Sequence, residues 1–153
     1  MAMPTLDQQL CFALYSASRA MTASYRPLLA ELGITYPQYL VMLVVWEQER
    51  LSVGDLGERL RLDSGTLSPL LKRLESAGLV RRERSASDER VVDVVLTDDG
   101  RALEQRARDV PRQAYLATGL SLDESADLRD AVRRLADSLD ENRHDPHRRK
   151  DSA

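Results

Sequence analysis

The chain of 153 residues contains one cysteine, Cys11, and no apolar segment long enough to cross a membrane. A single cysteine cannot form a disulfide within the chain. The first five residues do not resemble a signal peptide, and no segment repeats along the sequence. These absences predict one cytoplasmic domain with no membrane partner.

The sequence also lacks an excess of positive charge, because its net charge is −3 and its pI is about 5.5. Composition therefore does not indicate nucleic-acid binding, which would require a local basic surface. No paired acid and base side chains of the kind that enzymes use stand out, so we do not expect an enzyme. His144 and His147 are a weak metal signal at most, and we predict no metal and no cofactor.

The middle of the sequence contains two short helix patterns in close succession. Ser52 with Asp55 has the form of a capping box, which predicts a helix that ends near residues 61–62. Asp63 is placed to cap a second helix, whose leucines recur at helical spacing and which should stop at residues 77–78. Only a few residues separate the two helices, so the turn between them is tight.

Two strands are predicted after the second helix. Residues 79–80, 91–92 and 94–96 are aliphatic or β-branched, and residues 85–89 are rich in charge and turn formers. This pattern predicts a β-hairpin with an exposed tip. Two helices followed by such a hairpin describe a winged helix-turn-helix, whose second helix enters the major groove of double-stranded DNA.

Candidate DNA-binding residues lie on the second helix and the hairpin. Small or polar side chains near the helix N-terminus are expected to contact base edges and phosphates, namely Ser64, Gly65, Thr66 and Ser68. Positive charge around them comes from Lys72, Arg73, Arg82, Arg84 and Arg90. On the hairpin, Arg90 is placed to enter a minor groove.

Helices are predicted on both sides of this unit. Residues 6–31 form a long amphipathic helix that Pro27 should kink, and Pro37 suits the first turn of the next helix. After the hairpin, Thr97 can cap a helix that runs past Pro111. The predicted fold is mainly α with a small β-hairpin wing, flanked by N- and C-terminal dimerisation helices.

The end of the sequence contains one more helix and a tail. Ser121 with Glu124 makes a further capping box, and residues 143–153 are predicted to be a disordered polar tail. The helices at about 6–31 and 110–141 have more apolar surface than a small winged domain needs for itself. We therefore expect a two-fold homodimer, which matches a pseudo-palindromic operator.

The segment LDSGTLSPLLKRLE at residues 62–75, together with GLV at residues 78–80, resembles the recognition region of MarR-type transcription regulators. The segments DER at 88–90 and LTDDG at 96–100 resemble the same family. The resemblance extends from about Leu6 to Asn142, and it implies a single winged-helix domain over residues 1–142 with a DNA-binding lobe at about 50–98. It also implies that Asp88 braces Arg90.

The cysteine has tyrosines at informative spacings. Tyr15 is one helical turn beyond Cys11, Tyr25 is fourteen residues beyond it, and Tyr36 opens the next helix. A phenol that donates to a thiolate favours the ionised sulfur and lowers the pKa of the thiol. Fourteen residues span roughly 21 Å of helix, so Tyr25 cannot reach Cys11 of its own chain. Antiparallel pairing of the first helices would bring Tyr25 to Cys11 of the other protomer.

The spacing of Cys11, Tyr25 and Tyr36, with TYPQY at 35–39, resembles the OhrR branch of the MarR family, the organic-hydroperoxide sensors. The resemblance implies a repressor in which the hydroperoxide oxidises Cys11 to a sulfenic acid. Because the sequence has no second cysteine, a small cellular thiol is the expected partner for a mixed disulfide. Operator release would follow.

Three alternatives stay open from the sequence. The first is a MarR-type repressor that releases DNA when a small aromatic or anionic ligand binds without covalent chemistry. The second is a thiol peroxidase that uses Cys11, which the missing resolving cysteine disfavours. The third is a winged helix without DNA affinity, which would show no salt-dependent binding to duplex DNA.

Overall fold

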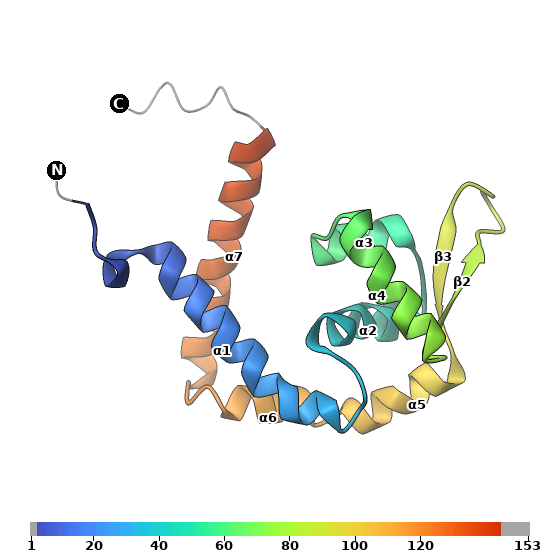
Figure 1. The fold of residues 1–153 in the computed structure, drawn as a ribbon, viewed down its shortest axis with the longest axis horizontal. Helices are drawn as coiled ribbons and strands as arrows, with labels where there is room; N and C mark the ends of the chain where they lie inside the picture. Colours follow the sequence, from blue (N-terminus) through green and yellow to red (C-terminus); the bar gives the residue numbers. More distant parts are fainter. Residues whose placement is uncertain (1–2, 145–153) are drawn as a thin grey trace. The chain divides into compact units, whose positions relative to one another are not determined.

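The computed structural model describes residues 3–144, which divide between two compact units, Met1–Ala117 and Thr118–Ala153. Each unit is described by itself (Figure 1). The first contains the 3-10 helix η1 and six α-helices, with a three-stranded sheet. Their bounds are η1 Leu6–Gln8, α1 Leu10–Ala30, α2 Tyr36–Gln48, β1 Arg50–Ser52, α3 Val53–Leu60, α4 Ser64–Ser76, β2 Val80–Arg84, β3 Val92–Leu96, α5 Asp98–Ala107 and α6 Val110–Leu116. The mainly helical class with a β wing is confirmed.

The predicted helix-turn-helix is formed by α3 and α4. The Ser52 hydroxyl accepts the Asp55 N–H at 3.0 Å, and α3 ends at Leu60, followed by the C-cap residue Arg61, whose φ of 55° is left-handed. The Asp63 carboxylate accepts the Thr66 N–H at 2.8 Å and so caps α4. Leucines at helical spacing bury one face of α4, at Leu67, Leu71 and Leu74. Both predicted caps are confirmed.

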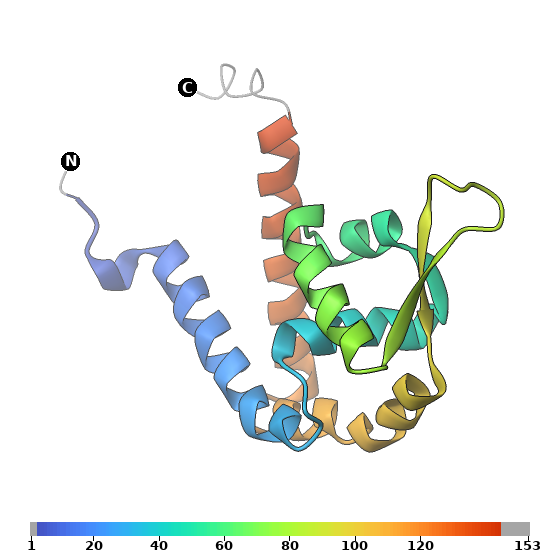
Figure 2. The same cartoon turned by 45° about the vertical axis from the view of Figure 1, so that its right-hand side comes forward.

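The wing is part of a sheet with strand order β1-β3-β2, in which both pairs are antiparallel. The sequence predicted a two-stranded hairpin and missed β1, which pairs Arg50 with Val95 and Ser52 with Asp93. A strand of three residues that leads directly into α3 is too short to show period-two alternation. Figure 2 shows the β2–β3 hairpin extending away from the helices of this unit.

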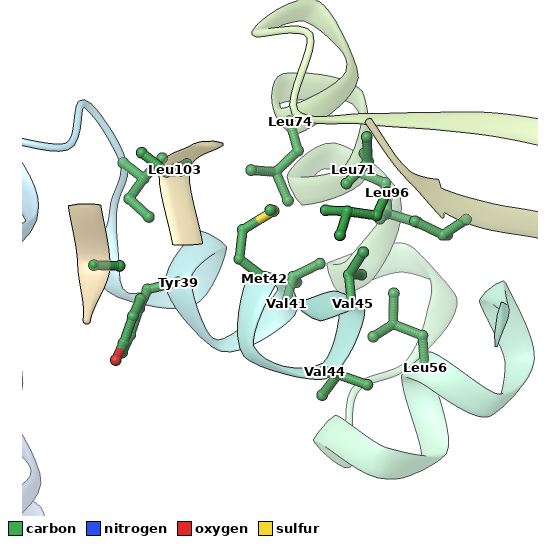
Figure 3. Close-up of a cluster of buried hydrophobic side chains, with 14 of the residues drawn as sticks. Tyr39, Val41, Met42, Val44, Val45, Leu56, Leu71, Leu74, Leu96 and Leu103 are labelled. Carbon is green, nitrogen blue, oxygen red and sulfur yellow. The ribbon is translucent and has the colours of Figure 1, made fainter. Parts of the chain in front are cut away.

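Helix α2 lies at the centre of the hydrophobic core. Most of its circumference is buried, and its side chains meet those of α3, α4, β3 and α5, as the residues labelled in Figure 3 show. A helix that is apolar on most sides is expected in such a central position. Its buried apolar residues are Tyr39, Val41, Met42, Val44 and Val45.

A close contact at Gly100 joins the wing to α5. The Thr97 hydroxyl accepts the Gly100 N–H at 3.0 Å and donates to the Gly78 carbonyl at 2.6 Å. The Trp46 indole donates to the Gly100 carbonyl at 2.9 Å. A Cβ at position 100 would lie 2.2 Å from the Leu79 carbonyl oxygen. Only glycine therefore fits without moving the backbone.

The predicted helix from Thr97 past Pro111 is wrong in its extent. The structure instead has α5 ending at Ala107 and α6 beginning at Val110. Proline has no N–H to donate to the carbonyl four residues earlier, and it disfavours helical geometry in the residue before it. Pro111 therefore suits the first turn of a new helix better than the interior of a long one.

The second unit contains α7, Leu122–His144. Its start is the predicted capping box, because the Ser121 N–H donates to Glu124 Oε2 at 2.8 Å and the Glu124 N–H donates to Ser121 Oγ at 3.3 Å. Residues 143–144 of the predicted tail belong to α7, whereas residues 145–153, including His147, lie outside the described residues. Over residues 3–144, no helix is long and apolar enough to cross a membrane.

We expect Gly100→Ala to lower the free energy of unfolding by about 1–3 kcal/mol, because the added methyl group overpacks a backbone contact. Urea denaturation monitored by circular dichroism measures the change. Gly54→Ala is the matched control, since its Cβ would meet only the Ser52 hydroxyl at 3.6 Å, and it should be neutral or stabilise by up to about 1 kcal/mol. Equal stability of the two variants would contradict the proposed constraint at Gly100.

Candidate functional site

The N-terminal part of α4 presents a small polar surface. Ser64, Gly65, Thr66 and Ser68 are all exposed there. The Thr66 hydroxyl donates to Asp63 Oδ2 at 3.0 Å, so this side chain is held by the cap. Hydrogen bonds from Thr66, first from its N–H and then from its hydroxyl, lower the pKa of the Asp63 carboxyl. The cap therefore stays ionised near neutral pH.

The basic residues around α4 divide into two groups. Lys72 and Arg73 are exposed and form no ion pair within residues 3–144. Arg82, which the sequence analysis counted as free positive charge, is instead bound to Glu75. The guanidinium Nε and Nη2 of Arg82 donate to Glu75 Oε2 at 3.0 and 2.7 Å, and the backbone N–H of Arg82 donates to Glu75 Oε1 at 3.0 Å. Arg82 thus ties β2 to α4.

The tip of the wing is organised around Asp88 and Arg90. Arg90 Nε and Nη2 donate to the two Asp88 carboxylate oxygens at 3.1 and 3.2 Å, and the Arg90 N–H donates to Oδ1 at 3.0 Å. Arg84 donates to the Glu89 carbonyl at 2.9 Å. The Arg90 side chain is nevertheless 90% exposed, so the ion pair orients its charge without covering it. These hydrogen bonds lower the pKa of the Asp88 carboxyl.

A charge network across the sheet was missed by sequence reasoning. Arg50 on β1 donates to Glu83 on β2 at 2.6 Å and to Asp93 on β3 at 3.0 Å, while Arg81 also bonds Glu83. Arg50 is far from Glu83 and Asp93 in the sequence and meets them only through strand pairing. No local pattern could have shown the network once β1 had been missed.

Cys11 is exposed near the start of α1. Tyr15, one turn later, is also exposed, and Arg19 donates to its hydroxyl at 3.0 Å with the guanidinium carbon 5.5 Å from the ring centre. Helix α1 is continuous from Leu10 to Ala30, so Tyr25 lies roughly 21 Å along it from Cys11. Within one chain the structure does not bring these two residues together.

Tyr25 and Tyr36 do meet, and they belong to a larger aromatic cluster. Their ring centres are 4.8 Å apart, Tyr25 lies 5.8 Å from Tyr39, and Tyr39 lies 6.1 Å from Trp46. Burial raises the pKa of Tyr25 and of Tyr36, and it raises the pKa of Tyr39 to about 12. These phenols therefore stay protonated and able to donate near neutral pH.

Two cavities border this aromatic cluster. One, of about 310 Å³, is lined by Tyr39, Leu43, Trp46, Glu47, Glu104, Ala107, Arg108 and Pro111. The other, of about 340 Å³, is lined by Thr22, Arg26, Leu29, Ala30, Ile34, Thr35, Tyr36 and Pro37. No group of side chains suited to a metal ion occurs in the described part of the chain.

Comparison with known proteins places the fold among transcriptional regulators. The family of the transcriptional regulators SarA and Rot matches residues 23–106. The chain is 53% identical to the HTH-type transcriptional regulator TtmR of Methylorubrum extorquens, over 88% of this chain and 69% of TtmR. It is 48% identical to the organic hydroperoxide resistance transcriptional regulator of Bacillus subtilis, over 88% of this chain and 91% of that protein.

A solved structure of reduced AbfR bound to DNA is also similar. AbfR is a protein of Staphylococcus epidermidis. The match has a TM-score of 0.74 at 36% identity, and it covers 88% of this chain and 94% of AbfR.

The raised tyrosine pKa values predict a loss of stability in alkali. Tyr39 ionises near pH 12 in the folded chain, against about 10 for an unperturbed tyrosine. Because the pKa of Tyr39 is higher in the folded chain than in the unfolded chain, its protonated phenol stabilises the fold. This contribution is complete below pH 10 and is lost as the pH rises towards 12. We expect the urea midpoint to fall over this range, and to fall less in Tyr39→Phe. A phenolate absorbance titration in which Tyr39 ionises at its ordinary pKa would contradict the prediction.

Proposed function

The chain belongs to the MarR/SarA family of transcriptional regulators, and from this premise we propose that it is a repressor controlled by the oxidation of Cys11. In this proposal a homodimer binds a pseudo-palindromic operator in double-stranded DNA. An organic hydroperoxide and a small cellular thiol then convert Cys11 to a mixed disulfide, and the operator is released. Such a regulator acts in the cytoplasm, where bacterial DNA is found.

Helix α4 would read the major groove of each half-site. Ser64, Gly65, Thr66 and Ser68 are exposed at its N-terminal part, where recognition helices contact base edges. Lys72 and Arg73 supply charge for phosphates, and Arg84 and Arg90 do so on the wing. Asp88 would hold Arg90 in the orientation needed to enter a minor groove.

Pairing through α1 would complete the redox site. Apolar side chains are exposed along α1 at Leu10, Phe12 and Met21, and a second copy would cover them. If two α1 helices run antiparallel, Cys11 of one protomer approaches Tyr25 and Tyr36 of the other. The observation that carries the proposal is the direct packing of Tyr25 on Tyr36, with the only thiol exposed on the same helix. Two protonated phenols placed together can both donate to one thiolate.

The chemistry proceeds in two balanced steps. The Cys11 thiolate attacks the distal peroxide oxygen, the O–O bond breaks, and the sulfur becomes a sulfenic acid as an alkoxide leaves and takes a proton from solvent to give the alcohol. The small thiol then attacks that sulfur, a disulfide forms, and the hydroxyl leaves as water. The added group would displace the two phenols and change the separation of the two α4 helices. Half-sites lie about 34 Å apart, so a dimer that no longer matches this spacing loses paired contacts.

One observation favours a second candidate function. The 310 Å³ cavity is largely apolar and also contains the charged side chains of Glu47, Glu104 and Arg108, the mixture expected of a site for a small aromatic or anionic ligand. A ligand bound there without covalent chemistry would contact both α2 and α5. Operator release from Cys11→Ala on addition of such ligands would support this function over oxidation.

Arg90→Ala should weaken binding to duplex DNA about tenfold and reduce the slope of log K against log salt by about one, because one cationic contact is lost. Asp88→Asn keeps the charge of Arg90 and removes the ion pair that orients it. It should weaken binding less and leave the salt slope unchanged. Fluorescence anisotropy at several salt concentrations separates these results. Wild-type affinity of Arg90→Ala at every salt concentration would remove the wing from the interface.

Cys11→Ser should bind the DNA upstream of its own gene like the wild type, and should keep binding after treatment with an organic hydroperoxide and a small thiol. The wild type should be released and gain one thiol adduct. Anisotropy with intact mass recorded in parallel measures both. Release of Cys11→Ser on oxidation would refute the redox switch.

Peroxide consumption with excess reductant tests the thiol peroxidase alternative. We expect no sustained turnover of peroxide by this protein.

A further inference from the structure

The cavity of about 340 Å³ between α1 and the start of α2 has positive charge on its wall and no negative charge. Arg26 is the one charged residue among those that line it, and no acid is present. Hydroxyl groups come from Thr22, Thr35 and Tyr36, and the rest of the wall is apolar. Its volume lies at the lower end of the range of roughly 300–1,000 Å³ for small-molecule sites.

Arg26 is available for a ligand. The residue is exposed, and among residues 3–144 no hydrogen bond or ion pair holds its guanidinium. The cavity near Trp46 differs, since two acidic residues, Glu47 and Glu104, line it together with Arg108. A guanidinium offers paired N–H donors whose geometry matches a carboxylate. Helix α2 also begins at this cavity, and the positive end of its dipole has the same sign as Arg26.

The cavity is continuous with the proposed redox site because Tyr36 belongs to both. The ring of Tyr25 packs on Tyr36, so the tyrosine pair and the cavity wall share one side chain. A group attached to the partner protomer's cysteine beside these two phenols would extend towards the guanidinium. The inference therefore rests on the proposed function, and specifically on its second chemical step.

We propose that the cavity beside Arg26 binds the carboxylate of the small thiol that forms the mixed disulfide with Cys11 of the other protomer. The thiol sulfur attacks the sulfenic acid, the S–S bond forms and water leaves, while the carboxylate pairs with Arg26. The site selects carboxylate-bearing thiols over neutral ones. Arg26 is a positioning residue, since it contacts the incoming thiol away from the reacting sulfur atoms.

The test compares N-acetylcysteine with N-acetylcysteine amide, which lacks the carboxylate charge. The protein is first oxidised with cumene hydroperoxide, a neutral oxidant, and the sulfenic acid is quantified with dimedone in a separate aliquot. Each thiol is then added, and adduct formation is followed by intact mass. For each protein, the rate with N-acetylcysteine is divided by the rate with N-acetylcysteine amide. The wild-type ratio divided by the Arg26→Gln ratio is a quotient in which the intrinsic reactivity of each thiol cancels.

We expect this quotient to be about fivefold and to shrink with added salt, as for a solvent-accessible ion pair. Arg26→Lys should restore part of the selectivity. The charge-matched control is Arg59→Gln on α3. Arg59 forms a surface ion pair with Glu47 and does not line the cavity. It should behave like the wild type. A quotient of one for Arg26→Gln, with normal sulfenic acid yield, would overturn the proposed carboxylate site.

A second arm distinguishes failure of this inference from failure of the proposed function. Reduced protein is mixed with the symmetrical disulfide of each thiol, so that Cys11 is modified by exchange without any peroxide. If the reaction in this arm favours the carboxylate-bearing disulfide, and if this preference depends on Arg26, the result supports the site even when no sulfenic acid forms in the first arm. Its absence in both arms overturns the inference, whereas absence of sulfenic acid alone overturns the peroxide step of the proposed function.

Discussion

The backbone contact at Gly100 is the constraint on which the arrangement of the winged lobe depends. Here the Leu79 carbonyl, at the entry to the wing, approaches α5 more closely than any side chain would allow. The Thr97 hydroxyl joins the same point to Gly78, and the Trp46 indole joins it to α2. Helix α2 therefore connects two regions of the proposed mechanism. Its first residue, Tyr36, packs on Tyr25, and its last turns hold the joint between the wing and α5. In the proposed mechanism, a displacement of the tyrosines would therefore act on the same helix that supports the wing.

Pairing of charges explains how an acidic protein can present a basic surface to DNA. Arg50 and Arg82 have carboxylate partners and serve to fasten the strands to each other and to α4. Lys72 and Arg73 have no such partner within the described residues, and Arg90 has one but stays exposed. The second group supplies exposed positive charge on α4 and the wing, whereas the net charge of −3 is a sum over the whole chain. Net charge is consequently a poor guide to this interface.

Features set by neighbouring residues could be predicted from the sequence, and those set by distant residues could not. The caps at Ser52 and Asp63 depend on a side chain and an N–H three residues later, so their pattern is visible in the sequence. Strand β1 is stable only through its pairing with β3, and the partner of Arg82 is brought to it by the turn after α4. The helix break before Pro111 is also encoded locally, by the missing N–H of proline, although the cap at Thr97 alone predicted a helix that ran past it. For the redox residues, the spacing of Cys11 and Tyr25 on one helix could exclude contact within a chain, but their meeting across a dimer needs a second copy.

The lack of a second cysteine has a consequence for how such a sensor gains selectivity. A protein with a resolving cysteine supplies both sulfur atoms of its disulfide, so its own fold determines which thiol reacts. In the proposed function the second sulfur comes from solution, where thiols compete according to concentration and reactivity. Selectivity then has to come from noncovalent contacts close to the cysteine. The wall formed by α1 and the start of α2 offers one unopposed cation beside the tyrosine pair. Because opposite charges attract over several ångströms even near water, a single arginine can bias that competition without taking part in the exchange of sulfur bonds.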